Sequence, residues 1–390
     1  MKKGLPFSLA EYKERLKKVK EKMVEREVDI FLTHTPENIF YLTGYFTPGY
    51  YKYQTCIVPL DREPIMLTRH FEQPNVYHLS WIEESIVYDD IEDHVALTRK
   101  ALVEAGCEKK RIGVEKDSWF LTPRDLERLV EVMPEATFKD CSGIVESARL
   151  IKSPQEIAYI EQAARTTEKA MQAGIDAVVE GATEDEIAGE VWRAMVAAGS
   201  EWPGLAPFVT TGPRTALPHG TWAGRVVEKG DVFGFEISGC VHRYSAPMFR
   251  CGVLGEPTKQ VASMGEATKF ALEETIKVMK PGVTSHEVNK ACQEAMEEAG
   301  WGGVHLHRSA YSVGICFPPD WGEGQIMSLQ DGDPTPLQAG MVFHVIPTLL
   351  VEGVAGIATT DTVLVTEQGG KALTDFERKL AIKSVRGVKN

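Results

Sequence analysis

The sequence lacks the features that mark secreted, zinc-binding and membrane proteins. Its seven cysteines are odd in number and scattered, with no Cys-x-x-Cys pair, so neither a disulfide framework nor a zinc knuckle is predicted. The most apolar stretch, 340–358, contains His344, Pro347 and Glu352 and falls short of the roughly 20 apolar residues of a spanning helix. The amino terminus has no apolar signal-peptide segment. These absences favour a cytoplasmic protein without a membrane partner.

Basic side chains are also in short supply. The chain has 43 Lys and Arg residues against 56 Asp and Glu residues, a formal net charge of −13. A nucleic-acid surface must concentrate basic groups to displace counterions, so this balance argues against nucleic acid as a partner. With 43% hydrophobic and 25% charged residues the composition is that of a globular protein, and 390 residues predict two or three domains.

The first 150 residues predict a mixed-sheet α/β domain. Ser8 and Glu11 form a capping-box pattern that opens the first helix. Short β-branched runs bounded by Pro, Gly and Asp then alternate with helical patterns. The pattern changes at the phrase KSPQE, where Ser153 and Glu156 form a second capping box. We therefore place the domain boundary there.

Residues 151–390 predict a second, α+β domain. Two helices followed by a hairpin occur twice along it, which indicates a duplicated α+β unit. The last third is rich in strand patterns and is expected to end in a closing helix near Asp375. The other expected elements are helices at 154–180, 258–279 and 285–299, a helix opened by Thr183 and Glu186, and a hairpin over 231–255.

Several phrases of the second domain resemble the creatinase/prolidase/methionine aminopeptidase superfamily, which has the pita-bread fold. RLIKSPQEI resembles its domain-opening helix, and GDVFGFEISG resembles a strand that carries a metal-binding Asp. AGMVFHVIP and TTDTVLVTEQGGKALT resemble two later phrases of the same superfamily, in the same order. The amino-terminal residues, including ENIFYLTGY, resemble the creatinase-type first domain. The resemblance implies a creatinase-like domain over 1–150 and a pita-bread catalytic domain over 151–390.

Peptidases of this superfamily hold two metal ions with two Asp, one His and two Glu. By resemblance, these positions fall on Glu236, Pro247, Tyr311, Ile346 and Thr360. A pair of divalent ions needs several oxygen or imidazole donors, which one glutamate cannot provide. The sequence therefore predicts neither a metal nor another cofactor. Peptide cleavage is not expected, because the metal polarises the amide and generates hydroxide in these peptidases.

A metal-free member needs a substrate whose carbon is already electrophilic, such as a protonated amidine or guanidine. FEISGCVHRYSAP and YSVGICFPPDWGE resemble the ectoine hydrolase type, whereas Tyr311 and Ile346 replace a histidine and a glutamate that creatinase keeps. The resemblance therefore implies hydrolysis of the zwitterionic amidine ectoine to N-acetyl-diaminobutyrate. Three alternatives stay open: creatine hydrolysis, an Xaa-Pro metallopeptidase, and a non-catalytic pita-bread binding module.

Two residues are candidates for catalysis. Glu236 stands in the apolar run FGFEISG, where an anionic carboxylate is costly to bury unless it is paired or held for a cation. Its superfamily position implies the nucleophile or the carboxylate that activates water. His219, in ALPHGTW, matches the superfamily's active-site histidine, which implies proton transfer to the leaving nitrogen. The plain alternatives are a structurally paired glutamate and a solvated loop histidine.

Other residues are candidates for substrate binding. Tyr311 either points into the former metal cavity or is an ordinary core tyrosine. Arg308 or Arg250 could bind a substrate carboxylate in bidentate geometry, with a structural role as the equal alternative. His344, His305 and His307 flank the same strands.

The tyrosine-rich segment 44–54 is a candidate interface. In creatinase-type homodimers this region of one subunit closes the active site of the other. The resemblance therefore implies that residues 51–54, including Tyr53 and Gln54, contact the partner chain and its substrate. Surface or edge tyrosines at the start of a strand are the alternative.

Overall fold

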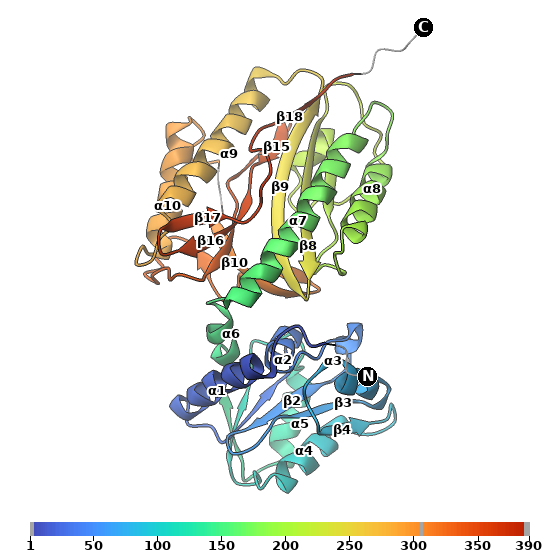
Figure 1. The fold of residues 1–390 in the computed structure, drawn as a ribbon, viewed down its shortest axis with the longest axis vertical. Coiled ribbons are helices and arrows are strands. Elements are labelled where there is room, and N and C mark those ends of the chain that lie inside the picture. Colours follow the sequence, from blue (N-terminus) through green and yellow to red (C-terminus); the bar gives the residue numbers. More distant parts are fainter. Residues whose placement is uncertain (1–3, 305–306, 386–390) are drawn as a thin grey trace. The chain divides into compact units, whose positions relative to one another are not determined.

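The computed structural model describes residues 4–304 and 307–385, and Figure 1 shows its fold. The chain divides into two compact units, Met1–Arg149 and Leu150–Asn390, beside the predicted boundary. His305 lies outside the described residues. Within the described ranges, every helix is too short or too polar to span a bilayer.

The first unit is built on a mixed β-sheet. Its strands are β1 (Ile30–Thr33), β2 (Thr55–Pro59), β3 (Ile65–Arg69), β4 (Ser85–Tyr88), β5 (Arg111–Val114) and β6 (Thr137–Asp140). Its helices are α1 (Leu9–Glu25), α2 (Pro36–Thr43), α3 (Gln73–Leu79), α4 (His94–Glu104), α5 (Pro123–Val132) and α6 (Ile144–Arg149), with short turns η1 (Pro48–Tyr51) and η2 (His70–Glu72). The strand order is β4-β3-β2-β1-β5-β6. Because β1 pairs antiparallel with β2 and parallel with β5, the predicted mixed α/β sheet is confirmed.

The second unit combines two helix pairs with a larger sheet. Its helices are α7 (Pro154–Ala177), α8 (Glu184–Ala197), α9 (Lys259–Val278) and α10 (Ser285–Glu298), with the short turn η3 (Gly212–Ala216). Its strands are β7 (Phe208–Thr211), β8 (Val232–Val241), β9 (Tyr244–Leu254), β10 (Ala310–Phe317), β11 (Asp320–Gly322), β12 (Ser328–Leu329), β13 (Val342–Val345), β14 (Thr348–Val351), β15 (Ala355–Ala358), β16 (Asp361–Thr366), β17 (Gly369–Ala372) and β18 (Ala381–Lys383). The main path runs β17-β16-β13-β10-β9-β8-β7, and β11 and β12 pair with β10.

Local sequence signals start the long helices of this unit. At Ser153 with Glu156, both bonds of the capping box are made at the start of α7. The same reciprocal bonds open α8 at Thr183 and α10 at Thr284. Each box satisfies two backbone N–H groups that the first helical turn leaves unpaired. The predicted starts of these helices are therefore confirmed.

Each helix pair packs its apolar face on strands, as Figure 1 shows for α7 and α8 beside β8 and β9. Met171 of α7 and Val191 of α8 share a buried cluster with Phe233, Phe235 and Ile237 of β8. Helices α9 and α10 pack in the same way on a second cluster that includes residues of β14 and β15. Strand side chains alternate between faces. Gly234, Glu236 and Ser238 of β8 therefore lie on the face that turns away from α7 and α8.

The predicted closing helix near Asp375 is wrong. Residues after β17 run as an irregular segment to β18, which pairs in parallel with β9. The backbone carbonyls of Phe376 and Glu377, which a helix would use internally, accept hydrogen bonds from the Arg250 guanidinium. Arg378 pairs with the buried Asp361 at 2.7 Å. These tertiary bonds replace the helix that the local pattern favours.

Candidate active site

A row of three partly exposed side chains crosses adjacent strands of the second unit. Glu236 of β8 lies opposite Phe208 of β7 and Phe249 of β9. Each of the three is partly exposed while its neighbours in the chain are buried. Directly opposite residues of antiparallel strands place their side chains on the same face. The row therefore lies on the face of the sheet that turns away from α7 and α8, and its side chains are partly accessible there.

Glu236 is a largely buried carboxylic acid with an aromatic residue opposite it on each neighbouring strand. Burial, and then the nearby charge of Asp320, raise the pKa of Glu236 to about 8. Its carboxylate lies 3.9 Å from Nδ1 of His344, and no hydrogen bond to it is found among the described residues. Burial lowers the pKa of His344 to about 3, so this histidine is neutral and is no ion-pair partner. Of the two sequence hypotheses, the geometry favours a carboxylate held for a ligand over a structurally paired one.

Tyr311 and His344 lie beside Glu236 in a chain of hydrogen bonds. Trp321 Nε1 donates to the Tyr311 hydroxyl at 2.9 Å, and that oxygen lies 2.8 Å from His344 Nδ1. His344 Nε2 lies 2.6 Å from Thr360 Oγ1. If the Tyr311 proton points to Nδ1, neutral His344 carries its proton on Nε2 and donates it to Thr360. The chain fixes the orientation of both predicted residues next to the carboxylate.

His219 and Arg308 lie at the exposed rim of the site. The His219 ring centroid is 5.5 Å from that of Phe208. Its φ of 55° puts a non-glycine residue in the left-handed region, which costs energy and clusters at functional positions. The Arg308 guanidinium lies 4.7 Å above the Tyr311 ring, and its Nη1 donates to Ser328 Oγ at 3.1 Å. Arg308 is exposed, and among residues 4–304 and 307–385 its other N–H groups make no hydrogen bond, so they can bind a ligand carboxylate.

Strand β11 forms a further wall of the site. The Trp321 ring lies 5.1 Å from Phe208, so it connects the aromatic row to Tyr311. The preceding residue, Asp320, is partly buried and acts electrostatically on Glu236. From the sequence, Asp320, Trp321 and Glu323 are predicted to form an ordered loop over the site or a simple turn, whereas the structure forms the short strand β11 from the first two of them and Gly322. The phrase PPDWGE was the signal for them, whereas Phe208 became visible only through the strand register.

A buried ion pair holds this wall in place. Lys152 Nζ lies 2.9 Å from Glu323 Oε2, and both side chains are 1% exposed. Glu323 also accepts a bond from the backbone N–H of Ile315 at 3.1 Å, and Lys152 donates to Ser312 Oγ at 3.3 Å. A buried charge pair is tolerated only when such extra bonds satisfy both groups. The pair ties the start of α7 to β10 and to the residue that follows β11.

Arg250 lies outside the site, contrary to one of the two sequence hypotheses for it. It stands opposite Phe235, so its side chain is on the helix-covered face of the sheet. Its guanidinium is buried, pairs with Asp361 at 2.7 Å and donates to the carbonyl of Glu377 at 2.8 Å. All of its donor nitrogens are used internally. Arg250 is structural, and Arg308 is the arginine that the structure brings to the site.

Tyr53 and Gln54 are turned into the first unit. The Tyr53 ring stacks on His94 at 4.3 Å, and its hydroxyl lies 3.0 Å from Thr98 Oγ1. Gln54 is 4% exposed. The predicted contacts to a partner chain therefore do not fit these two side chains. In the same segment, Tyr51 is 73% exposed.

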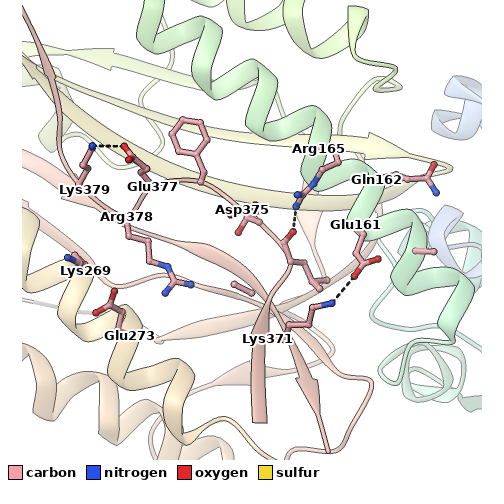
Figure 2. Close-up of a pocket in the computed structure, with 15 residues that line it drawn as sticks. Glu161, Gln162, Arg165, Lys269, Glu273, Lys371, Asp375, Glu377, Arg378 and Lys379 are labelled. Atoms are coloured by element: carbon pink, nitrogen blue, oxygen red, sulfur yellow. Dashed lines mark hydrogen bonds and ion pairs between the residues drawn. The ribbon is translucent and has the colours of Figure 1, made fainter. Parts of the chain in front are cut away.

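A separate open cavity of about 1030 Å³ lies against α7, α9 and the segment after β17 (Figure 2). Its charged side chains largely neutralise one another. Lys371 pairs with Glu161 at 3.1 Å, and Lys379 pairs with Glu377 at 2.6 Å. Exposed pairs of this kind contribute little free energy, and Glu236 does not line the cavity. We therefore place the chemistry at the Glu236 row.

Family comparisons assign both units. The model of the creatinase/prolidase N-terminal domain matches residues 15–151, and that of metallopeptidase family M24 matches residues 158–367. The second match spans more than half of the chain. This chain belongs to metallopeptidase family M24.

Full-length relatives of this M24 member include two kinds of enzyme. Ectoine hydrolase from Halomonas elongata is 31% identical over 400 residues, covering 97% of this chain and 99% of the relative. Xaa-Pro dipeptidase from Pyrococcus furiosus is 27% identical over 372 residues, covering 94% and 99%. The prolidase structure from Pyrococcus horikoshii OT3 superposes with a TM-score of 0.83 at 24% identity, covering 94% of this chain and 100% of that one. The M24 member is therefore a hydrolase acting on C–N bonds, and the pita-bread fold is confirmed.

The side chains at the family's metal positions do not fit a pair of metal ions. Glu236 supplies the one carboxylate, and the Tyr311 hydroxyl is engaged with Trp321 and His344. Thr360 Oγ1 accepts a bond from the backbone N–H of Phe249 at 2.7 Å besides its contact with His344. Over residues 4–304 and 307–385, no group of three or more His, Cys, Asp or Glu side chains is arranged to hold a metal ion. Divalent ions need several such donors at once.

Proposed function

We propose that this enzyme is a metal-independent hydrolase of a small zwitterionic amidine, and that ectoine, opened to N-acetyl-diaminobutyrate, is its substrate. The observation that carries the proposal is Glu236, a carboxyl group between aromatic rings that has no cationic partner among the described residues. The full-length similarity to an ectoine hydrolase, at 31% identity, supports the same substrate. A bound amidinium supplies the cationic partner that Glu236 lacks among the described residues.

Glu236 acts at the amidine carbon. In the empty site its pKa of about 8 keeps much of it protonated at neutral pH. A bound amidinium favours the ionised form, since an opposite charge nearby lowers the pKa of a carboxyl group. The carboxylate then attacks the cationic carbon or directs a water molecule at it. Phe208 and Phe249 stand opposite Glu236 on the two neighbouring strands and share its face of the sheet, and aromatic rings there favour a flat, delocalised cation.

The overall reaction adds one water molecule across one C–N bond. The water oxygen ends on the amidine carbon, which becomes the amide carbon, and the bond from this carbon to one ring nitrogen breaks. His219 gives a proton to the leaving nitrogen and recovers one from water. The net charge is conserved, because one amidinium becomes one neutral amide and one ammonium group.

Turnover of a substrate panel tests the proposal. Protein treated with a chelator is incubated separately with ectoine, creatine and an Xaa-Pro dipeptide, with and without added Mn²⁺, and products are followed by mass spectrometry. We expect ectoine opening that the chelator does not reduce. Cleavage of the dipeptide that requires Mn²⁺ would instead establish an Xaa-Pro metallopeptidase, and creatine turnover a creatinase. A protein that turns over none of the three would be a binding module.

Arg308→Met is expected to raise KM for ectoine about 10- to 100-fold, because it removes charge-assisted bonds to the substrate carboxylate. The effect on the decarboxylated analogue of ectoine is expected to be much smaller. Steady-state kinetics on both compounds check the assignment. Arg250→Met is the contrasting variant: it leaves Asp361 with one partner fewer and is expected to lower the free energy of unfolding by about 3 kcal/mol. Equal KM effects on the two compounds would contradict the role of Arg308.

We also propose that the enzyme works in the cytoplasm as a homodimer, with exposed residues of the first unit at the interface. Tyr51 and Lys52 take the place of Tyr53 and Gln54 in this proposal because both are exposed. Light scattering of the purified protein is expected to give twice the mass of the 43.2 kDa chain. Tyr51→Glu is expected to shift this mass toward the monomer, and a monomeric wild-type protein would exclude the interface.

A further inference from the structure

A second carboxyl group, that of Asp320, acts electrostatically on Glu236. Asp320 begins β11, which pairs antiparallel with β10 through Phe317 and Asp320 and through Val313 and Gly322. The next side chain along β11, that of Trp321, contacts the aromatic row. A Cβ placed at Gly322 would lie 3.6 Å from Asp320 Oδ1 and 2.6 Å from the Tyr311 ring, so the Asp320 carboxyl group lies on the Tyr311 side of β11. Its charge also acts on Glu236, which places it in the wall beside the proposed catalytic carboxyl group.

The backbone around Asp320 is tightly held. Ser245 Oγ donates to the carbonyl of Trp321 at 2.7 Å. The carbonyl oxygen of Asp320 lies so close to Gly204 that a Cβ there would meet it at 1.9 Å. Position 204 must consequently be glycine for β11 to reach this place, and the carboxyl group is presented from a rigid strand.

Asp320 has no ion-pair partner within 4.0 Å among the described residues, although its surroundings are charged. Its Oδ1 accepts a hydrogen bond from the backbone N–H of Gly322 at 3.0 Å. Burial raises the pKa of Asp320, and the backbone N–H groups of Gly322 and Trp321, followed by the charges of Arg308 and His219, oppose that rise. The site thus holds two partly buried carboxyl groups, Glu236 and Asp320, and the charge of Asp320 raises the cost of ionising Glu236. A cation bound between them relieves this cost, whereas an anion or a neutral amide does not.

We propose that Asp320 binds an N–H group of the amidinium and selects for a cation, which leaves Glu236 to act at the carbon. The inference rests on the proposed function and deepens it. In a planar amidinium the N–H bonds lie in the plane, whereas a nucleophile approaches the carbon from above or below that plane. Two carboxylates on different walls, one on β8 and one on β11, can meet these two requirements at once.

A purely structural role is the competing explanation, because Asp320 also accepts the Gly322 bond within its own turn. The Asp320→Asn variant separates the two roles, since asparagine keeps the accepting oxygen and loses only the charge. A structural role predicts kinetics like those of the wild type. The charge role predicts that KM for ectoine rises about tenfold or more, with a smaller change in kcat.

The variant is compared with wild type and with Glu352→Gln, a carboxyl-to-amide change at an exposed turn. Two further readouts mark the charge role. The pH at which KM for ectoine changes is expected to move downward in Asp320→Asn, because Glu236 no longer has a negative neighbour. The free energy of unfolding at neutral pH is expected to stay equal or to increase. An unchanged KM together with an unchanged pH profile would overturn the inference.

Binding measurements keep this test separate from that of the proposed function. Calorimetry with ectoine and with its decarboxylated analogue is run on wild type and Asp320→Asn. If wild type binds ectoine without turning it over, the proposed function falls, and the affinity of the variant still decides the role of Asp320. If wild type binds neither ectoine nor its analogue, both proposals fall.

Discussion

Turnover of ectoine by the Glu236→Gln variant is expected to fall at least about a thousandfold, since removing a nucleophile or a water-activating carboxylate abolishes most catalysis. Glutamine has nearly the same shape and fits the space between Phe208 and Phe249. It can neither attack the amidinium carbon nor accept a proton from water. Initial rates at saturating substrate, with an unchanged circular dichroism spectrum, check this expectation.

Two further variants, one in the site and one at an exposed turn, accompany Glu236→Gln. His219→Gln is expected to lower kcat as well, but the loss should shrink with an amidine whose leaving nitrogen is less basic, because that nitrogen needs less help from an acid. Glu352→Gln is expected to behave as wild type. Retained turnover in Glu236→Gln would show that the chemistry lies elsewhere in the chain.

Glu236→Gln is also expected to stabilise the protein at alkaline pH. Its free energy of unfolding at pH 9 is expected to exceed that of wild type by about 2 to 4 kcal/mol. In the folded protein the pKa of Glu236 is about 8, against an ordinary value of 4.5. Below pH 4.5 both states hold the proton, and the group makes no difference to stability. Between pH 4.5 and pH 8 Glu236 loses its proton in the unfolded state but keeps it in the folded state. The free energy of unfolding of wild type therefore falls as pH rises through this range. Above pH 8 Glu236 is ionised in both states, and the whole cost of burying its charge is subtracted from the free energy of unfolding.

Urea unfolding of wild type and Glu236→Gln at several pH values checks this expectation. The difference between the two proteins cancels the other titrating groups that they share. We expect the curves to meet near pH 4 and to separate as pH rises, with equal m-values. A difference that is constant across pH would mean that the folded-state pKa of Glu236 is close to its ordinary value.

The fold could be predicted wherever short-range signals decide it. The capping box at Ser153 and Glu156 and the alternating strands of the first unit are local patterns, and the structure contains both. The segment near Asp375 is different, because its carbonyl groups bond to Arg250, more than a hundred residues away. No local pattern reports such a bond, so the helix predicted there is wrong.

The residues of the site also divide into those that local motifs mark and those that only the strand register reveals. Glu236, Tyr311 and His344 were found because they stand at motif positions, and the structure brings them together. The choice between Arg250 and Arg308 needed the strand register, since a shift of one residue moves a side chain to the opposite face. Phe208 was missed for the same reason. It pairs with Glu236 across strands that are separated by a loop and a turn, and nothing in its own neighbourhood marks it.

The buried pair of Lys152 and Glu323 gives the protein an indirect means of changing its substrate range. Lys152 touches no part of the aromatic row, yet the carboxylate that it neutralises follows β11 directly. A substitution at this lysine would release or reposition Asp320 and Trp321 without replacing any residue that meets the ligand. Selection or directed evolution toward other amidines is thus expected to enrich changes at this concealed anchor as well as on the surface that meets the ligand.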